Sequence, residues 1–137
     1  MSKKEAKTDL WVYNLLRDAN IELEPQGSSI VEINNALKTA SKNGTKKVGF
    51  PEYVGVVKDF LIVIEDKADL GKHVKLDEKG LISSKQSDIK NFALNGALFY
   101  GQHLAKNTSY KKILAFGISG NERKHKISPI YIDDTEK

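Results

Sequence analysis

Two glutamates and a lysine frame the most hydrophobic stretch of the chain, residues 49–69. Glu52 comes near its start, while Glu65 and Lys67 come at its end, directly after the apolar run FLIVI. Carboxylates and a lysine in such positions are the groups that hold a divalent cation and a phosphate oxygen. The spacing therefore raises the question of whether these three side chains meet.

A hairpin would bring them together. If Lys58 and Asp59 form a two-residue turn between antiparallel strands, residue 52 lies opposite residue 65. Side chains alternate along a strand, so Glu65 and Lys67 share one face. Directly opposed Cβ atoms lie about 5 Å apart, so the two glutamates would be close neighbours.

Two carboxylates at that distance repel each other, and partial burial raises one pKa or demands a cation. Mg²⁺ prefers one or two carboxylates, several waters and phosphate oxygens, and Mn²⁺ is its expected substitute. A lysine beside them can hold an attacking water or a phosphoryl oxygen. The alternative interpretation is a salt-bridged strand end whose charged residues are merely solvated.

Composition is that of one domain of 137 residues, with 39% hydrophobic and 29% charged residues. The start MSKKEAKTDL lacks the apolar core of a signal peptide, and no run approaches the ~20 apolar residues of a membrane helix. Absence of cysteine excludes a disulfide framework, so we expect a cytoplasmic protein without membrane association. A net charge of +4 permits a polyanionic partner, but also fits a merely soluble surface.

Hydrophobic periodicity predicts an α/β domain, with a mixed central sheet flanked by helices. The run DFLIVIED predicts a central strand that is covered on both faces. Thr8 and Asp9 are expected to cap the first helix, and Ser29 with Glu32 the second. The remaining expected elements are a strand at 48–57, a helix at 87–106, a strand at 110–119 and an edge strand at 127–133.

Pro51-Glu52 and Glu65-Asp66-Lys67, in this order of elements, resemble the PD-(D/E)xK nuclease superfamily, which has the restriction-endonuclease-like fold. The stretch from Ala36 to Val74, with ALNGALFYGQHL and KILAFGISG after it, resembles the N-terminal nuclease domains of type I restriction subunits and fused type II restriction–modification enzymes. The resemblance covers roughly residues 30–132.

This resemblance implies that Glu52 and Glu65 ligate Mg²⁺, that the backbone carbonyl of Asp66 is a further ligand, and that Lys67 positions the attacking water. It implies hydrolysis of DNA phosphodiester bonds. Glu52 departs from the commoner aspartate. The glutamine that many relatives carry four residues before Tyr100 is Gly96 here, and Asn95 could substitute for it in part.

Other acids compete for a place at the metal. Asp59 would lie in the hairpin turn, about 20 Å of strand away from Glu65, and is rejected. An acid on the first helix assists the metal in some members of the superfamily. Glu5, Asp9 and Glu32 are the candidates, although solvation or helix capping is the more ordinary role for each.

Basic residues near the hairpin are candidates for salt-dependent contacts with DNA phosphates, against the alternative of a solvated lysine-rich surface. They are Lys42, Lys46, Lys47, Lys72 and His73. We expect residues 1–137 to form a single nuclease-like domain, the N-terminal part of a longer chain. Its partners would be double-stranded DNA, methyltransferase, translocase or specificity domains, and a second copy in a dimer on DNA.

Two other functions fit the same residues. One is a repair or recombination nuclease that acts alone. The other is a nucleic-acid-binding or protein-interaction module without catalysis, in which the motif is accidental. A metal-induced rise in melting temperature separates the nuclease interpretations from the module, because a cation bound to the native state stabilises it.

Overall fold

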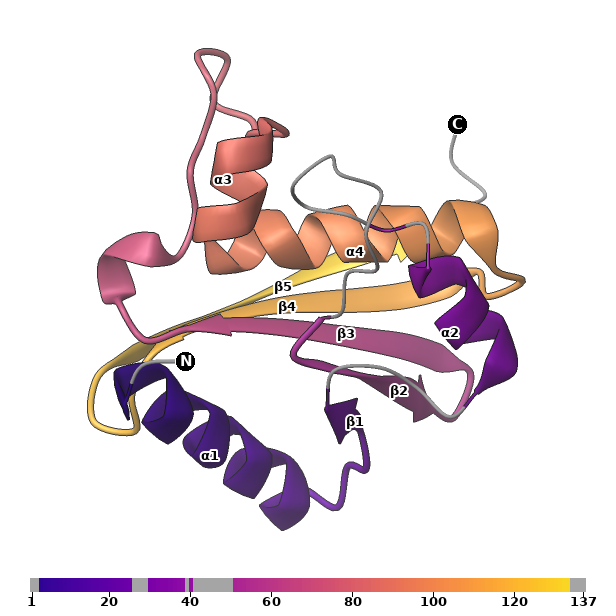
Figure 1. Cartoon of the computed structure of the whole chain (residues 1–137), viewed down its shortest axis with the longest axis horizontal. Helices are drawn as coiled ribbons and strands as arrows, with labels where there is room; N and C mark the ends of the chain where they lie inside the picture. The colour runs from indigo at the N-terminus through magenta and orange to yellow at the C-terminus, as the bar shows by residue number, and fades with distance from the viewer. Residues whose placement is uncertain (1–2, 26–29, 39, 41–50, 134–137) are drawn as a thin grey trace.

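The computed structural model describes residues 3–25, 30–38, 40 and 51–133, with the side chains of residues 3–5 and 25 excepted. Its elements form one layered arrangement around a sheet (Figure 1). In chain order they are α1 (Lys3–Asp18), β1 (Glu24–Pro25), α2 (Val31–Leu37), β2 (Tyr53–Val57), β3 (Phe60–Lys67), the 3-10 helix η1 (Leu70–Lys72), α3 (Gln86–Asn91), α4 (Ala93–Asn107), β4 (Lys112–Gly120) and β5 (His125–Asp133).

The strands lie side by side in the order β1-β2-β3-β4-β5. β3 and β4 are parallel, and the other neighbouring pairs are antiparallel. The parallel pair is joined by α3 and α4, because parallel strands need a long crossover. The prediction of a mixed-sheet α/β domain is confirmed, and the arrangement is compatible with the restriction-endonuclease-like fold.

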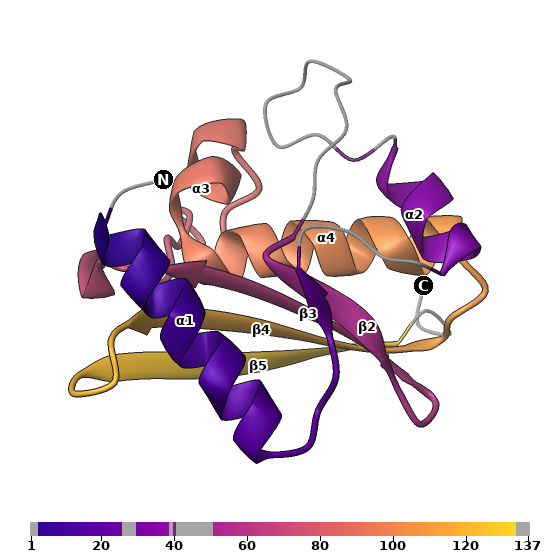
Figure 2. The same ribbon diagram turned by 60° about the horizontal axis from the view of Figure 1, so that its bottom comes forward.

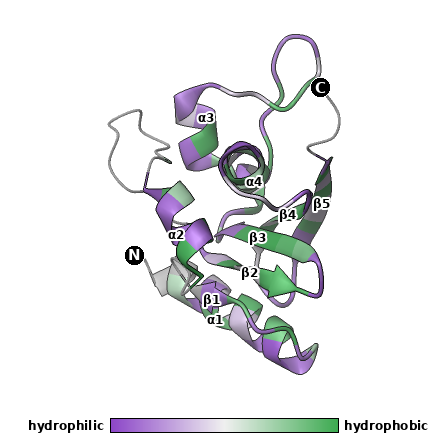
Figure 3. Cartoon of the chain, turned by 90° about the vertical axis from the view of Figure 1, so that its right-hand side faces the viewer, coloured by the Kyte–Doolittle hydropathy of each residue, from purple (hydrophilic) through white to green (hydrophobic). Residues whose placement is uncertain are grey.

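β3 is the central strand that its composition predicts, and residues 61–66 are buried. Its alternating side chains enter two separate cores. Leu61 and Val63 pack with α2 and α4, whereas Ile62 and Ile64 pack with Val12 of α1. Figure 2 shows α4 on one side of the sheet and α1 on the other, and Figure 3 shows the hydrophobic β3 between them.

Several predicted boundaries are wrong. α1 begins at Lys3, so Thr8 and Asp9 lie inside the helix and do not cap it. The N-cap of α2 is Ile30, without a side-chain cap, which excludes the predicted capping box; Ser29 lies outside the described residues. The helix expected over residues 87–106 is divided in two at Phe92, whose backbone is extended (φ −121°, ψ 135°).

The division at Phe92 has a tertiary cause. The N–H of Leu94, in the first turn of α4, donates to the carbonyl oxygen of His73 at 2.8 Å. The loop after β3 thus satisfies an N–H group that has no partner within its own helix. Sequence periodicity does not reveal such a contact, because it joins segments about twenty residues apart.

Gly117 of β4 lets α4 approach the sheet. An added Cβ would lie 2.6 Å from Cα and 2.7 Å from N of Leu94. These are backbone atoms, which cannot move aside as a side chain can. We expect Gly117→Ala to lower the free energy of unfolding in urea by about 1–3 kcal/mol, the usual cost of overpacking. Gly71→Ala is the matched control, because an added Cβ there meets only the Asp69 side chain; equal losses in both variants would contradict the prediction.

Within the described part of the chain, no helix is both long enough and apolar enough to cross a membrane.

Candidate metal centre

The end of β3 presents charged side chains on both faces of the sheet. Glu65 and Lys67 continue the face that Leu61 and Val63 direct toward α4, and Asp66 continues the opposite face toward α1. Glu65 and Asp66 are both buried, with 3% and 6% of their surface exposed, and Lys67 is half-buried. Buried carboxylates at a strand end are costly unless something compensates their charge.

The predicted hairpin register is confirmed. Val57 pairs with Phe60 and Tyr53 pairs with Ile64, so residues 52 and 65 are the next opposed pair. The backbone N–H of Glu52 donates to Oε1 of Glu65 at 2.9 Å. The two predicted metal ligands therefore lie next to each other, joined through the backbone of one and the carboxylate of the other.

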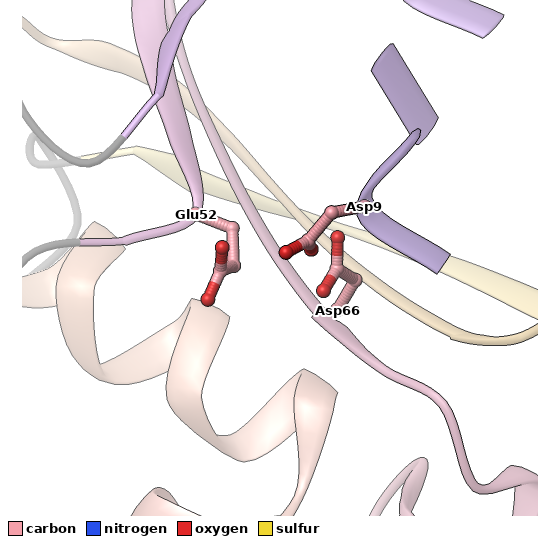
Figure 4. Close-up of side chains that lie close together, drawn as sticks. All are labelled: Asp9, Glu52 and Asp66. Atoms are coloured by element: carbon pink, nitrogen blue, oxygen red, sulfur yellow. The ribbon is translucent and has the colours of Figure 1, made fainter. Parts of the chain in front are cut away.

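The carboxylate of Glu52 belongs to a cluster that the sequence motif does not contain. Carboxylate oxygens of Asp9, Glu52 and Asp66 all lie within 4.8 Å of one another. Figure 4 shows the Asp9 and Asp66 side chains directed toward each other, with the side chain of Glu52, the residue before β2, beside them. At an effective dielectric constant of about 20, each pair of full charges at this distance repels by roughly 3 kcal/mol. The cluster therefore needs a cation, or a retained proton, to be stable.

Two hydrogen bonds fix Asp9 in this position. Thr8 is buried, and its hydroxyl donates to the carbonyl oxygen of Gly120 at the end of β4 (2.9 Å). The hydroxyl of Tyr53 donates to the carbonyl oxygen of Asp9 itself (3.0 Å). Burial, followed by the negative charges of Asp9 and Asp66, raises the pKa of Tyr53 to about 12, which keeps its hydroxyl protonated as a donor. The sheet thus holds α1 against the end of β3.

The carboxyl of Asp66 is strongly perturbed by its surroundings. Burial raises the pKa of its carboxyl to about 10, and the side chains of Asp9, Glu52 and Glu65 add to the effect. Oδ2 of Asp66 and Oδ1 of Asp9 are buried without a hydrogen-bond partner among the described residues. Unpartnered buried oxygens are rare in native proteins and call for a missing proton or ion.

This perturbation predicts a pH-dependent stability in the absence of metal. A carboxyl with a raised native pKa contributes stability that is complete below its ordinary value of 3.8 and is lost as the pH rises toward 10. Between pH 7.5 and 9.0, urea unfolding in EDTA should show a loss of up to about 2 kcal/mol, at ~1.4 kcal/mol per pH unit. In Asp66→Asn the loss should be absent, and identical pH dependence in both proteins would contradict the assignment.

Tyr100 of α4 closes the other face of the site. It is fully buried, and burial together with the charges of Glu65 and Glu52 raises the pKa of its hydroxyl. The hydroxyl consequently remains protonated beside acidic neighbours. Asn95 is the amide suggested as a substitute for the missing glutamine. Its side chain instead forms hydrogen bonds with the backbone of Lys75 and Ser83.

The donor set fits a divalent cation. Carboxylate oxygens are the hard ligands that Mg²⁺ and Mn²⁺ take in proteins, and two of those present are buried without a partner. The side chains of Asp9, Glu52 and Asp66 could hold the ion, with Glu65 adjacent. The resemblance implied a role for the backbone carbonyl of Asp66, whereas the structure places the side chain of Asp66 in the cluster.

Asp59 and Glu32 lie apart from this cluster. Asp59 lies in the turn between β2 and β3, as predicted, and forms an ion pair with Lys112 of β4 at 3.0 Å. Both carboxylate oxygens of Glu32 accept hydrogen bonds from Ser109, and the side chain of Glu5 lies outside the described residues. Among the candidate acids whose side chains the structure describes, Asp9 is the one that reaches the cluster.

The predicted phosphate contacts divide into three groups. Lys42, Lys46 and Lys47 lie outside the described residues, and Lys72 is exposed. His73 is buried, with its ring nitrogens 2.8 Å and 2.7 Å from the hydroxyls of Ser119 and Ser128. Burial lowers the pKa of His73, so the neutral form is favoured. In this arrangement His73 ties the loop after β3 to the neighbouring strands rather than facing a phosphate.

The chain is similar to a known restriction enzyme. It is 33% identical over 138 residues to the type II restriction enzyme and methyltransferase RM.BcgI of Heyndrickxia coagulans. The similarity covers 99% of this chain but 22% of the relative, so the chain spans less than a quarter of the length of the protein it matches. No protein-family model and no solved structure matches the chain. The similarity supports a relationship to restriction enzymes.

Proposed function

We propose that this chain is a metal-dependent DNA endonuclease unit of a restriction–modification enzyme, which hydrolyses phosphodiester bonds of double-stranded DNA. The observation that carries the proposal is the trio of Asp9, Glu52 and Asp66, in which one buried oxygen each of Asp9 and Asp66 has no hydrogen-bond partner among the described residues. Glu65 and Lys67 lie on the other face of the same strand end. The similarity to a type II restriction enzyme and methyltransferase supports the choice of DNA and of a methyltransferase as partner.

Each residue of the site has a distinct task in this proposal. Asp9, Glu52 and Asp66 hold the cation, and Glu65 orients Glu52 by accepting its backbone N–H. When bound, Mg²⁺ lowers the pKa of a coordinated water and neutralises charge on the phosphate. Lys67 is half-buried and carries a compact positive charge, which can hold the attacking water or stabilise a phosphate oxygen. A cut through both strands requires two such sites, and hence a second copy on the DNA.

Supercoiled plasmid tests the proposal directly. We expect conversion to nicked or linear DNA with Mg²⁺ or Mn²⁺ and none with EDTA. Because the relative is much longer than this chain, the assay should also use the chain joined to, or mixed with, its methyltransferase if one is encoded beside it. Failure of every form to cut plasmid, despite a metal-induced rise in melting temperature, would leave a metal site without nuclease activity and overturn the proposal.

A further inference from the structure

A groove of about 410 Å³ lies between α1 and the turn that joins β4 to β5, outside the acid cluster. Its walls combine cationic, acidic, amide and apolar side chains, those of Lys7, Leu10, Trp11, Asn14, Asn121, Glu122 and Arg123. Figure 1 shows the N-terminal part of α1 beside this turn. The volume falls within the usual range of small-molecule sites, about 300–1,000 Å³.

The groove has a defined structure. The hydrogen bond from the hydroxyl of Thr8 to the carbonyl oxygen of Gly120 holds α1 against the base of the turn. Oδ1 of Asn121 accepts the backbone N–H groups of Arg123 and Lys124 at 2.9 Å and 3.0 Å, which closes the turn. Gly120 has a positive φ of 98°, and an added Cβ would collide with the carbonyl oxygen of Lys124, so this position requires glycine.

One aromatic side chain, Trp11, lines the groove. The rings of Trp11 and His125 lie 4.7 Å apart at an interplanar angle of 40°. Leu10, one residue earlier on the helix, is 60% exposed. An indole and an exposed leucine side by side form an apolar floor that gains by being covered. A flat partner such as a nucleobase can stack there, because every base has a π-face.

The rim of the groove is positively charged. Lys7 and Arg123 line it, and Lys124 and Lys126 are exposed in the same turn and strand. Glu122 is the acid among the lining residues. Lys7, Leu10, Trp11 and Asn14 share one helix face at positions i, i+3, i+4 and i+7, whereas Asp9 points about 200° away from Lys7 around the helix. A ligand in the groove therefore lies across α1 from the acid cluster.

We propose that this groove binds an unpaired nucleotide of DNA, with the base on Trp11 and the phosphate between Lys7 and Arg123. In a duplex the base faces are covered by their neighbours, so a base that stacks on Trp11 must be unpaired. Aromatic platforms within cationic grooves are how proteins bind single strands without reading sequence. The choice of DNA rests on the proposed nuclease function, but the groove itself requires neither the metal nor cleavage.

Trp11 is the single tryptophan of the chain, so it reports on its own environment. In EDTA, titration with the single-stranded octamer (dT)8 should quench tryptophan fluorescence saturably, and rising salt should weaken the complex. A blunt duplex should bind without this quenching. Because no metal is present, the result does not depend on whether the acid cluster is a nuclease site.

Variants locate the ligand. By anisotropy of labelled (dT)8, Trp11→Ala should weaken binding roughly 5- to 150-fold, the usual effect of losing one stacking partner, and Trp11→Phe should retain most of it. Arg123→Glu should also weaken binding, and Glu122→Gln should strengthen it. The control Lys90→Ala removes an exposed lysine of α3 and should change nothing. Absence of quenching, equal affinity of Arg123→Glu and wild type, or tighter binding of oligo(U) than of (dT)8 would overturn the proposal.

Discussion

Replacing Lys67 by alanine is expected to reduce the rate of DNA cleavage by roughly 10²- to 10³-fold, the usual cost of removing one group that stabilises a transition state. Lys67 ends β3 directly after Asp66, and it lies on the face of the strand that carries Glu65. No other residue of β3 carries a positive charge. The measurement is the rate of plasmid nicking at saturating Mg²⁺, under single-turnover conditions.

Two controls give this result its meaning. Lys90→Ala removes an exposed lysine at the end of α3 and should cut at the wild-type rate. Lys67→Ala should keep the metal-induced rise in melting temperature, because its ammonium is not a ligand. Equal nicking by Lys67→Ala and wild type would show that the lysine is an ordinary strand-end residue, and would remove the catalytic half of the proposal.

Replacing Asp66 by asparagine is expected to have two opposite effects on stability. The metal-free protein should become more stable by about 1–3 kcal/mol, because a buried acid among acids is replaced by a neutral group of similar shape. Its metal response should disappear, whereas wild type should gain ~2.7 kcal/mol when the free metal is at 100 times its dissociation constant. Thermal unfolding in EDTA and in a Mg²⁺ or Mn²⁺ series measures both.

Asp18→Asn is the matched control for this variant. Asp18 is an acid at the exposed C-terminal end of α1, so the same chemical substitution there leaves the cluster intact. It should behave as wild type in EDTA and in metal. Should Asp66→Asn retain a normal metal response, the cation binds elsewhere and the centre described here is incorrect.

The sequence determined the parts of the site that depend on local geometry. The apolar run from Phe60 to Ile64 predicted the central strand, and the two-residue turn predicted the register that places Glu52 opposite Glu65. Both follow from the two-residue period of a strand, which connects neighbouring positions through the backbone. The resemblance to a nuclease motif also followed from residues within one hairpin.

The tertiary structure alone decided the position of Asp9. Its sequence context suggested a helix cap, and nothing local distinguished it from Glu5 or Glu32. Asp9 reaches Asp66 because two hydrogen bonds hold α1 against the sheet. The hydroxyl of Thr8 donates to the carbonyl oxygen of Gly120, and the hydroxyl of Tyr53 donates to the carbonyl oxygen of Asp9. These contacts span 112 and 44 residues of sequence. Periodicity cannot predict them, because they depend on how a helix and a sheet pack.

Burial in the folded protein decided the chemical environments of His73 and Asp66. His73 was a candidate for phosphate contact by its position in a polar loop, yet the packing of that loop against β4 and β5 places both ring nitrogens beside serine hydroxyls. The side chain of Asp66 is buried because β3 is covered on both faces, and this burial, more than any neighbouring charge, shifts its pKa. A sequence specifies which groups are available, but the low-dielectric surroundings that change their chemistry arise only when distant segments pack together.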